Sequence, residues 1–288
     1  MLKYYAVFGH PIGHSLSPLI HNALITYYDL PGHYLPIDLA KADIGKFPEL
    51  WQNFNLSGAN VTMPHKQSVI SHLDTLDEAA QLYQTVNTIN QKDGKLVGHC
   101  TDGLGFCRSL AEKQISLQDQ NVLILGTGGV AQTLALTVAQ EKASGIAIAG
   151  RNTERAASIS AKVQQNFGLE PTLFGLEPSD LKTAAKKTDL VINATPLGMA
   201  GYPEDFPEFS WLTALPEWAL IYDLIYHPAQ TDLLKNADVL GFKTLNGWAM
   251  LVWQAFYAFK IFWGIMPGVA EKEYVEGILI QMGVLSLI

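Results

Sequence analysis

One stretch near the middle of the chain constrains its fold most strongly. It reads Asn121-Val-Leu-Ile-Leu-Gly126-Thr-Gly128-Gly129-Val-Ala131, an apolar run that breaks into glycines and continues as a helix-forming segment. A strand, a tight turn and a helix in this order place backbone N–H groups where they can bind a pyrophosphate. The stretch therefore predicts a dinucleotide site formed by Gly126, Thr127, Gly128, Gly129, Val130 and Ala131.

The glycine pattern departs from G-x-G-x-x-G, because Ala131 stands where the third glycine would be. Gly126 can form the tight turn, and Gly128 and Gly129 let the backbone approach a phosphate. Alanine is still small enough for close packing of helix on sheet. An ordinary strand-to-helix turn is the alternative, but the strand and helix signals on either side favour the nucleotide site.

Strand-like and helix-like segments alternate along the rest of the chain. Strands are expected at residues 3–9, 33–38, 58–62, 86–89, 95–98, 146–149, 190–194 and 219–224. Helices are expected at 17–28, 74–83, 102–113, 154–167, 180–186 and 230–236, with Ser17 as the cap of the first and Pro18 as its first residue. This alternation predicts an α/β fold with parallel sheets.

The chain of 288 residues is longer than one hydrophobic core usually needs. We expect two α/β domains. A discontinuous substrate-binding domain would comprise residues 1–102 and 246–288, and a Rossmann-like, doubly wound nucleotide domain would comprise residues 103–245.

Charge and cysteine content narrow the range of partners. The net charge of −8 and the pI near 5.4 argue against nucleic acid and anionic membranes as partners. Cys100 and Cys107 are too few and too close for a disulfide scaffold, and no secretory segment follows Met1. We therefore expect a cytoplasmic protein.

The apolar segment 247–267 is about as long as a membrane span. It contains Gln254 and Lys260, has no basic flank, and is rich in Trp and Phe rather than Leu and Ile. We expect a helix packed between the two domains instead, followed by a short helix from about Glu271.

Five histidines raise the alternative of a metal site. His10, His14 and His21 lie in one stretch, with His65 and His99 elsewhere. Their spacing does not match a known ligand set, and no carboxylate lies close in sequence to complete one. We expect no metal.

The end of the strand at 146–149 indicates which nicotinamide dinucleotide is bound. The sequence there is Gly150-Arg151-Asn152-Thr153-Glu154-Arg155, without the acidic residue that binds the ribose hydroxyls of NAD. Arg151 and Arg155 can hold a phosphate from one side of a helix start, which favours NADP. Alternatively, they form a solvated surface pair that Glu154 partly neutralises.

Polar side chains recur where the strands of the first domain end, which is where open α/β sheets bind ligands. They are Ser15, Ser17, Asn60, Thr62, Lys66, Asn87, Thr88, Thr101 and Asp102. Each alone has an ordinary role, such as a helix cap or a surface lysine. Their repetition at successive strand ends favours a cavity for a small hydroxylated acid.

The chain resembles the shikimate dehydrogenase family through blocks that keep the family's order over nearly its whole length. The blocks are His10-Pro-Ile-Gly-His-Ser-Leu-Ser-Pro-Leu-Ile-His-Asn22, Asn60-Val-Thr-Met-Pro-His-Lys66, Val86-Asn-Thr-Ile89, Thr101-Asp-Gly-Leu-Gly-Phe106, Asn193-Ala-Thr-Pro-Leu-Gly-Met199, Tyr222-Asp-Leu-Ile-Tyr226 and Met250-Leu-Val-Trp-Gln254. The resemblance implies reversible, NADP-dependent reduction of 3-dehydroshikimate to shikimate in aromatic amino-acid (chorismate) biosynthesis. It implies an active site between the domains of a monomer or homodimer.

The resemblance also implies a role for each matching residue. Lys66 and Asp102 would be the catalytic pair. The substrate would be bound by Ser15, Ser17, Asn60, Thr62, Asn87, Tyr226 and Gln254. The cofactor would be bound by residues 126–131 with Arg151, Asn152, Arg155, Thr195, Met199 and Gly247.

The chemistry of the reaction is consistent with the catalytic pair. Hydride transfer to a ketone leaves an alkoxide, so the site needs a proton donor or a positive charge within hydrogen-bond reach of that oxygen. Lys66 can supply both, and Asp102 can hold the ammonium in place or accept a hydroxyl proton. The sequence leaves open whether Lys66 donates the proton or only stabilises charge.

Several positions depart from the family's pattern. Cys100 replaces an asparagine, Gln84-Thr85 replaces Gly-Ala, Gly150 replaces an asparagine and Asn246 replaces an aspartate; Asn152 also falls in a changed stretch. Two alternatives follow: a dehydrogenase that also takes quinate and uses NAD or NADP, and a shikimate-sensing homologue without turnover.

Overall fold

The computed structural model describes residues 2–284, which fold into two compact units. The first unit contains the residues up to Gly105 and those from Val252 onward, and the second contains Phe106–Leu251. The chain passes from one unit to the other inside helices α4 (Asp102–Glu112) and α9 (Trp248–Trp263). These boundaries lie a few residues after the predicted ones.

The first unit contains a mixed sheet of six strands in the order β2-β1-β3-β5-β6-β4. Its strands are β1 (Lys3–Gly9), β2 (Gly32–Asp38), β3 (Leu56–Val61), β4 (Thr75–Leu76), β5 (Thr88–Lys92) and β6 (Lys95–His99). The first three are parallel, as predicted, whereas β5 runs antiparallel to both β3 and β6. Asp93 and Gly94 both have positive φ, which suits the tight hairpin predicted at this point.

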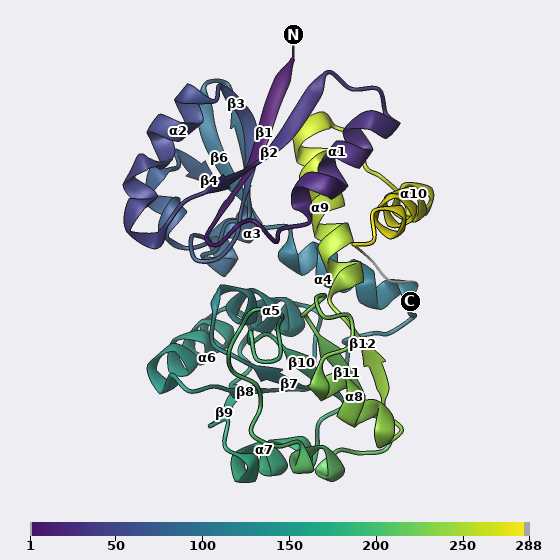
Figure 1. Ribbon diagram of the computed structural model, residues 1–288. Helices are drawn as coiled ribbons and strands as arrows, with labels where there is room; N and C mark the ends of the chain where they lie inside the picture. The colour runs from purple at the N-terminus through teal and green to yellow at the C-terminus, as the bar shows by residue number, and fades with distance from the viewer. Residues whose placement is uncertain (1, 285–288) are drawn as a thin grey trace. The chain divides into compact units, whose positions relative to one another are not determined.

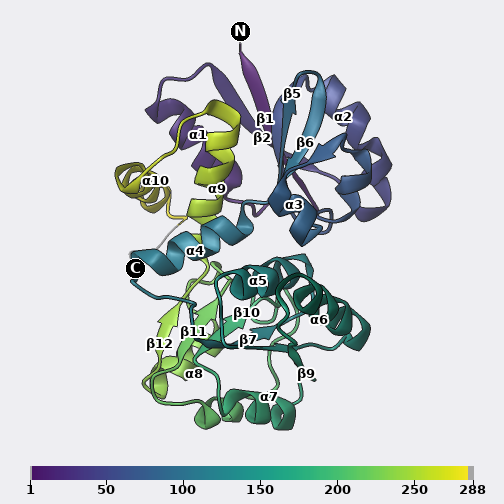
Figure 2. The same ribbon diagram turned by 180° about the vertical axis from the view of Figure 1, so that it is seen from behind.

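The helices of the first unit cover both faces of its sheet. They are α1 (Ser17–Tyr27), α2 (Phe47–Asn53), α3 (Glu78–Tyr83), α9 and α10 (Val269–Gln281), with 3-10 turns at Lys41–Lys46 and Ser68–His72. Helices α1, α9 and α10 lie on one face and α2 on the other, as the opposite views of Figures 1 and 2 show.

Two local predictions in this unit were wrong. Residues 74–83 are not one helix, because residues 75–76 pair with β6 and the side chain of Asp77 accepts the N–H of Ala80, which starts α3 there. Ser17 does not cap α1. It is the first residue of that helix, and its own N–H donates to Ser15 Oγ.

The apolar helix α9 packs its aromatic residues on the first sheet. The ring of Phe262 stands over Gly58 and that of Trp263 over Gly32, where any Cβ would come within 2.8 and 2.7 Å of a ring atom. The helix ends at Trp263, before Gly264 with its φ of +73°, so it is shorter than expected. Between residues 2 and 284 no helix has both the length and the apolar character that a membrane crossing requires.

The second unit contains an all-parallel sheet in the order β12-β11-β10-β7-β8-β9. Its strands are β7 (Asn121–Leu125), β8 (Gly145–Ala149), β9 (Thr172–Phe174), β10 (Leu190–Asn193), β11 (Leu220–Asp223) and β12 (Lys243–Leu245). This is the doubly wound Rossmann order, which confirms the predicted fold class. The edge strands β9 and β12 were not predicted, since three residues give too short a pattern.

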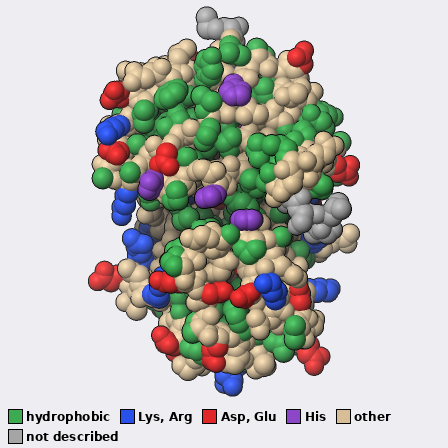
Figure 3. All heavy atoms as spheres, in the orientation of Figure 1, with side chains coloured by type: hydrophobic (Ala, Val, Ile, Leu, Met, Phe, Trp, Pro, Cys, Tyr) green, Lys and Arg blue, Asp and Glu red, His purple; other side chains and the backbone are tan. Residues whose placement is uncertain are grey.

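Four helices sandwich the second sheet. Helices α5 (Gly129–Gln140) and α6 (Thr153–Phe167) lie on one face, and α7 (Pro178–Ala185) and α8 (Asp232–Val239) lie on the other (Figures 1 and 2). A 3-10 turn at Ser210–Ala214 packs with α7. On the face seen in Figure 3, basic and acidic side chains are scattered among hydrophobic and polar ones.

Candidate active site

The ammonium of Lys66 and the carboxylate of Asp102 form the centre of the site. Lys66 Nζ lies 2.6 Å from Asp102 Oδ2, and the two side chains are only 13% and 5% exposed. Lys66 follows β3, and Asp102 is the first residue of α4. The fold of the first unit thus places two charges in direct contact although they are far apart in sequence.

Neighbouring backbone contacts fix the position of Lys66. Its carbonyl oxygen accepts the N–H of Val86 at 2.8 Å, just before β5. The preceding residue, His65, is fully buried and its Nε2–H donates to the carbonyl of Leu39 at 2.6 Å. The turn after β3 is therefore held from both sides, which limits where the ammonium can reach.

Asn87 and Gln254 complete the surroundings of Asp102. Asn87 Nδ2 lies 2.9 Å from Asp102 Oδ1 and 3.2 Å from Gln254 Oε1. The hydroxyl of Thr101 donates to the carbonyl of Gln254 at 2.9 Å. Gly105 permits this approach, because a Cβ there would lie 2.7 Å from the backbone nitrogen of Gln254. The structure thus brings together Lys66, Asp102, Asn87 and Gln254.

Asn60 lies behind this group and is engaged on all sides. It is 6% exposed, and its Nδ2 donates to the carbonyl of Asn87 at 2.9 Å and to Thr88 Oγ1 at 3.0 Å. Its Oδ1 accepts the hydroxyl hydrogen of Tyr34 at 2.7 Å. Sequence reasoning missed Tyr34, since no motif marks it and an aromatic residue on a strand usually belongs to the core.

The loop with the two predicted serines lies at the same edge of the sheet. It follows β1, whose last residue, Gly9, would place a Cβ 2.4 Å from Thr62 Cγ2 at the end of the neighbouring strand β3. Ser15 and Ser17 are half-buried and bonded to each other. Tyr226 belongs to the second unit, where burial raises its pKa. Its part in binding substrate stays a prediction.

The glycine turn of the second unit fits a dinucleotide. Gly126 has a φ of +114°, and a Cβ there would lie 2.9 Å from the carbonyl oxygen of Ala194. Only glycine allows this turn, which connects β7 to α5. It lies next to β10, at the point where the strand order of the sheet reverses. A Cβ at Gly128 would meet open space, and this N-cap makes no side-chain hydrogen bond, so the start of α5 can receive a pyrophosphate. Thr127, Gly129 and Val130 are half-buried and Ala131 is buried.

The two arginines lie at the start of α6, as expected. Both are exposed, and Asn152 caps the helix with its Oδ1 accepting the N–H of Arg155 at 2.8 Å. Arg151 Nη1 lies 2.6 Å from Glu204 Oε2. Hydrogen bonds to Tyr202 and Glu204 hold the pKa of Arg151 above its usual range. The arginines fit a phosphate, but a carboxylate already engages one of them.

The remaining predicted cofactor residues lie near the ends of β10 and β11. Thr195 Oγ1 donates to Asn193 Oδ1 at 2.7 Å, and Asn193 Nδ2 donates to the buried carboxylate of Asp223 at 3.0 Å. Met199 is half-buried in the loop that follows. Gly247 packs against β11's end, where a Cβ would meet the carbonyl of Leu224. This contact gives the glycine a packing reason, and its cofactor contact stays a prediction.

The structure gives physical reasons for the departures in the first unit. Thr85 Oγ1 and Cys100 Sγ lie 3.5 Å apart and both side chains are buried. The two residues that depart from the family's pattern therefore fill one buried space together. Burial raises the pKa of Cys100 to about 11, which makes it a poor target for thiol reagents. Gln84 has a φ of +51° at the end of α3, a conformation that favours glycine.

Two departures in the second unit also have local explanations. Any Cβ at Gly150 would lie 2.4 Å from Thr127 Cγ2, so the threonine in the turn requires a glycine at position 150. Asn246 donates to the carbonyl of Ala229 and accepts the N–H of Trp248. An aspartate could make only the second of these bonds.

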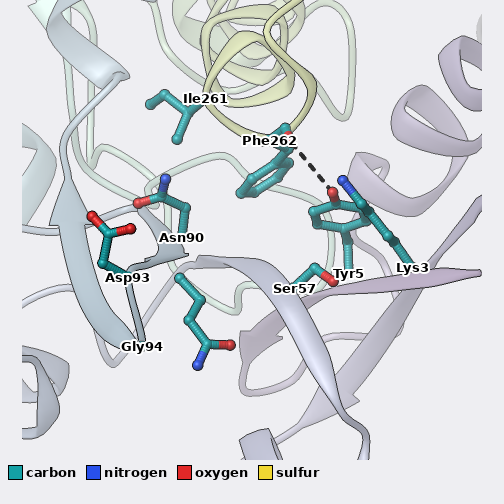
Figure 4. A pocket seen from close by; sticks show the side chains of 9 residues that line it. Lys3, Tyr5, Ser57, Asn90, Asp93, Gly94, Ile261 and Phe262 are labelled. Atoms are coloured by element: carbon teal, nitrogen blue, oxygen red, sulfur yellow. Dashed lines mark hydrogen bonds between the residues drawn. The ribbon is translucent and has the colours of Figure 1, made fainter. Parts of the chain in front are cut away.

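A separate cavity of about 390 Å³ lies at the opposite strand ends of the first sheet (Figure 4). Lys3, Ser57 and Asp93 belong to its lining, with Tyr5 donating to the carbonyl of Phe262 at its back. Lys3 and Ser57 lie at the starts of β1 and β3, whereas Lys66 follows the end of β3. This cavity is therefore not the catalytic site. Over residues 2–284, no group of three or more His, Cys, Asp or Glu residues could hold a metal ion.

Known proteins match this chain over most of its length. Residues 7–89 match the shikimate dehydrogenase substrate binding domain, and residues 109–198 match the shikimate / quinate 5-dehydrogenase family. A protein of Desulforamulus reducens named shikimate dehydrogenase (NADP(+)) is 36% identical over 94% of this chain and 95% of its own.

Solved structures share this fold over nearly the whole chain. Shikimate 5-dehydrogenase from Listeria monocytogenes, in complex with shikimate and NAD, superposes with a TM-score of 0.85 at 29% identity and covers 96% of each chain. The 5-ketofructose reductase of Gluconobacter sp. strain CHM43 gives a TM-score of 0.81 at 29% identity, over 96% of this chain and 99% of its own. From its sequence and its fold alike, the chain belongs to the shikimate dehydrogenase family.

Proposed function

We propose that this protein is an NADP-dependent shikimate dehydrogenase, an oxidoreductase that interconverts 3-dehydroshikimate and shikimate in aromatic amino-acid biosynthesis. The observation that carries the proposal is the buried contact of 2.6 Å between Lys66 and Asp102, with Asn87 and Gln254 around it. Relatives named shikimate dehydrogenase (NADP(+)) support both the reaction and the cofactor.

The catalytic pair can move one proton at the oxygen that changes between ketone and alcohol. NADP, when bound, supplies or accepts the hydride at the carbon of that group. The ammonium of Lys66 can donate a hydrogen bond or a proton to the oxygen as negative charge develops. Asp102 holds the ammonium at 2.6 Å. In the oxidation direction, the group that donates the proton during reduction takes it back from the substrate hydroxyl. The pair is shielded from water, which strengthens both effects.

We further propose that substrate binds to the first unit. Ser15, Ser17 and Thr62, at the edge where β1 and β3 end, supply hydroxyls for a carboxylate and ring hydroxyls. Gln254 and Asn87 supply amides, and Tyr226 would add a phenol. Two further proposals, a cytoplasmic location and a monomer or homodimer, rest on the sequence alone.

The second candidate is a dehydrogenase that accepts quinate, or that uses NAD as readily as NADP. The contact between Arg151 and Glu204 favours the use of NAD, because it engages the guanidinium that is expected to bind the extra phosphate of NADP. Similarity to a protein solved with NAD and to a 5-ketofructose reductase supports a broader range of cofactors and substrates. A sensing protein without turnover is the third candidate, and the retained pair argues against it.

One spectrophotometric assay separates these candidates. The purified protein is given shikimate or quinate with NADP or NAD, and reduced cofactor is followed at about 340 nm. We expect the highest kcat/KM with shikimate and NADP. Preference for NAD or quinate would support the second candidate, and binding of shikimate without turnover in all four mixtures would support the third.

A further inference from the structure

Buried hydroxyl and amide groups form a continuous line that ends at the catalytic pair. Tyr34 donates to Asn60 Oδ1 at 2.7 Å, and Asn60 Nδ2 donates to Thr88 Oγ1 at 3.0 Å. Thr88 Oγ1 donates to Asn87 Oδ1 at 3.0 Å, and Asn87 Nδ2 donates to Asp102 Oδ1 at 2.9 Å. None of the first four side chains is more than 6% exposed, so water does not compete for these bonds.

Each bond in this line sets the direction of the next. Tyr34 stays protonated, since burial keeps its pKa well above the usual range, and its hydroxyl donates to Asn60 Oδ1. The backbone carbonyl of Asn87 can only accept, so the NH₂ group of Asn60 faces that carbonyl and Thr88, and its oxygen faces the phenol. The threonine hydroxyl accepts there, so its own hydrogen points to Asn87 Oδ1. The N–H of Thr101 reaches the same oxygen at 2.8 Å.

The consequence falls on the amide of Asn87. Because its oxygen faces two donors, its NH₂ group faces the carboxylate of Asp102. The opposite orientation would set an amide oxygen against a carboxylate oxygen in a water-excluded space, which is unfavourable. The donated bond and the ammonium of Lys66 then act on the two oxygens of one carboxylate.

We infer that Tyr34, Asn60 and Thr88 are positioning residues of the catalytic pair, which act by holding the Asn87 amide with its N–H toward Asp102. Asn60 then acts through this line rather than as a direct ligand of the substrate, because both hydrogens of its amide are used inside the protein. The inference rests on the proposed function in that Lys66 and Asp102 are taken as the reacting groups.

The surroundings of Tyr34 allow its hydroxyl to be tested alone. The ring of His21 stacks on the phenol with centroids 4.3 Å apart and planes 2° from parallel. The side chain of Asn22 pairs with the backbone N–H and carbonyl of Tyr34, both at 2.9 Å. Tyr34→Phe therefore keeps the stack and the backbone contacts and removes only the donor to Asn60.

The first experiment compares turnover in matched variants. We expect kcat to fall roughly five- to tenfold in Tyr34→Phe and Thr88→Val, as for loss of one neutral hydrogen bond, with an unchanged KM for NADP. Thr88→Ser keeps the hydroxyl and should stay within about twofold of wild type. The control is Tyr5→Phe, a buried tyrosine on β1 of the same sheet whose hydroxyl bonds Phe262 instead. It should also stay within about twofold.

The second experiment reads the amide directly and needs no turnover. In NMR spectra of the ligand-free protein, the side-chain NH₂ resonances of Asn87 are assigned by their absence in Asn87→Ala. Their chemical shifts should change in Tyr34→Phe and stay the same in Tyr5→Phe. Wild-type kcat in Tyr34→Phe, or an unmoved Asn87 resonance, overturns the inference and leaves the proposed function standing. If the wild-type protein has no turnover, the proposed function fails and the resonance alone decides the inference. Should Tyr34→Phe fold poorly, the pair Thr88→Val and Thr88→Ser takes its place in both experiments.

Discussion

The ammonium of Lys66 is the group on which turnover should depend most. Lys66→Met keeps most of the apolar stem and removes the charge that touches Asp102 at 2.6 Å. We expect kcat to fall by about 10²–10⁴, the usual contribution of a positioned acid or base, with NADP binding unchanged by calorimetry. Lys95→Met, at an exposed position of β6, serves as the control. Near-normal turnover in Lys66→Met would remove Lys66 from the mechanism.

Asp223 should make stability depend on pH. It is fully buried, and burial raises its pKa from 3.8 to about 6, against hydrogen bonds from Thr231, Ile225 and Asn193 that lower it. Because the folded pKa is the higher one, the stabilisation from this group is complete below about pH 4. It is lost as the pH rises through about 6.

The test compares wild type with Asp223→Asn, which stays neutral. Between pH 4 and pH 7 the wild type should lose about 2 kcal/mol of unfolding free energy relative to the variant, as measured by urea unfolding. Parallel pH curves for wild type and Asp223→Asn would contradict the assignment.

At the scale of elements, the turn after β7 and the start of α6 depend on each other. A side chain at Gly150 would lie 2.4 Å from Thr127 Cγ2, so Gly150→Ala should displace the turn that faces the cofactor. We expect the KM for NADP to rise about five- to tenfold, as for overpacking of a filled space. Adding Thr127→Ala should restore it to about that of Thr127→Ala alone. Independent effects of the two changes in this double-mutant cycle would show that the contact does not matter.

The loop that contains Glu204 should tune the choice of cofactor. Its carboxylate lies 2.6 Å from the guanidinium of Arg151, so a bound phosphate would have to compete with it. Glu204→Gln should lower the KM for NADP by about two- to fivefold, a range typical of exposed ion pairs, and leave the KM for NAD unchanged. Glu170→Gln, at another exposed carboxylate, should change neither KM. Equal changes for both cofactors would mean that Glu204 does not act through the phosphate.

At the scale of the whole molecule, each ligand should protect one unit. NADP at about 100 times its Kd should slow amide hydrogen exchange up to about 100-fold. This applies to segments whose exchange requires an opening that destroys the NADP site. We expect this in residues 121–131 and 150–155 of the second unit. Shikimate should slow exchange in residues 10–17 and 60–66 of the first unit. Protection in the opposite units, followed by mass spectrometry, would contradict the assignment of ligands.

Local patterns were enough to predict most of the fold. Apolar runs that end in glycine or polar residues predicted the main strands, and the succession of strands and helices after the glycine turn predicted the doubly wound sheet. The pattern failed where tertiary pairing overrode it, as at Thr75–Leu76, which pairs with β6 although it precedes a helix without a break. It also missed edge strands of three residues.

By itself, the sequence determined the two α/β architectures and the family, because these follow from short-range periodicity and from motifs contiguous in the chain. The pairing of Lys66 with Asp102 as catalytic groups stays a prediction. Only the tertiary structure decided which distant groups touch. Tyr34 on β2 contacts Asn60 on β3 across the intervening strand β1. Thr85 and Cys100 share one buried space, and Glu204 lies against Arg151. Such contacts depend on which strands and loops become neighbours in space, and no local pattern specifies that.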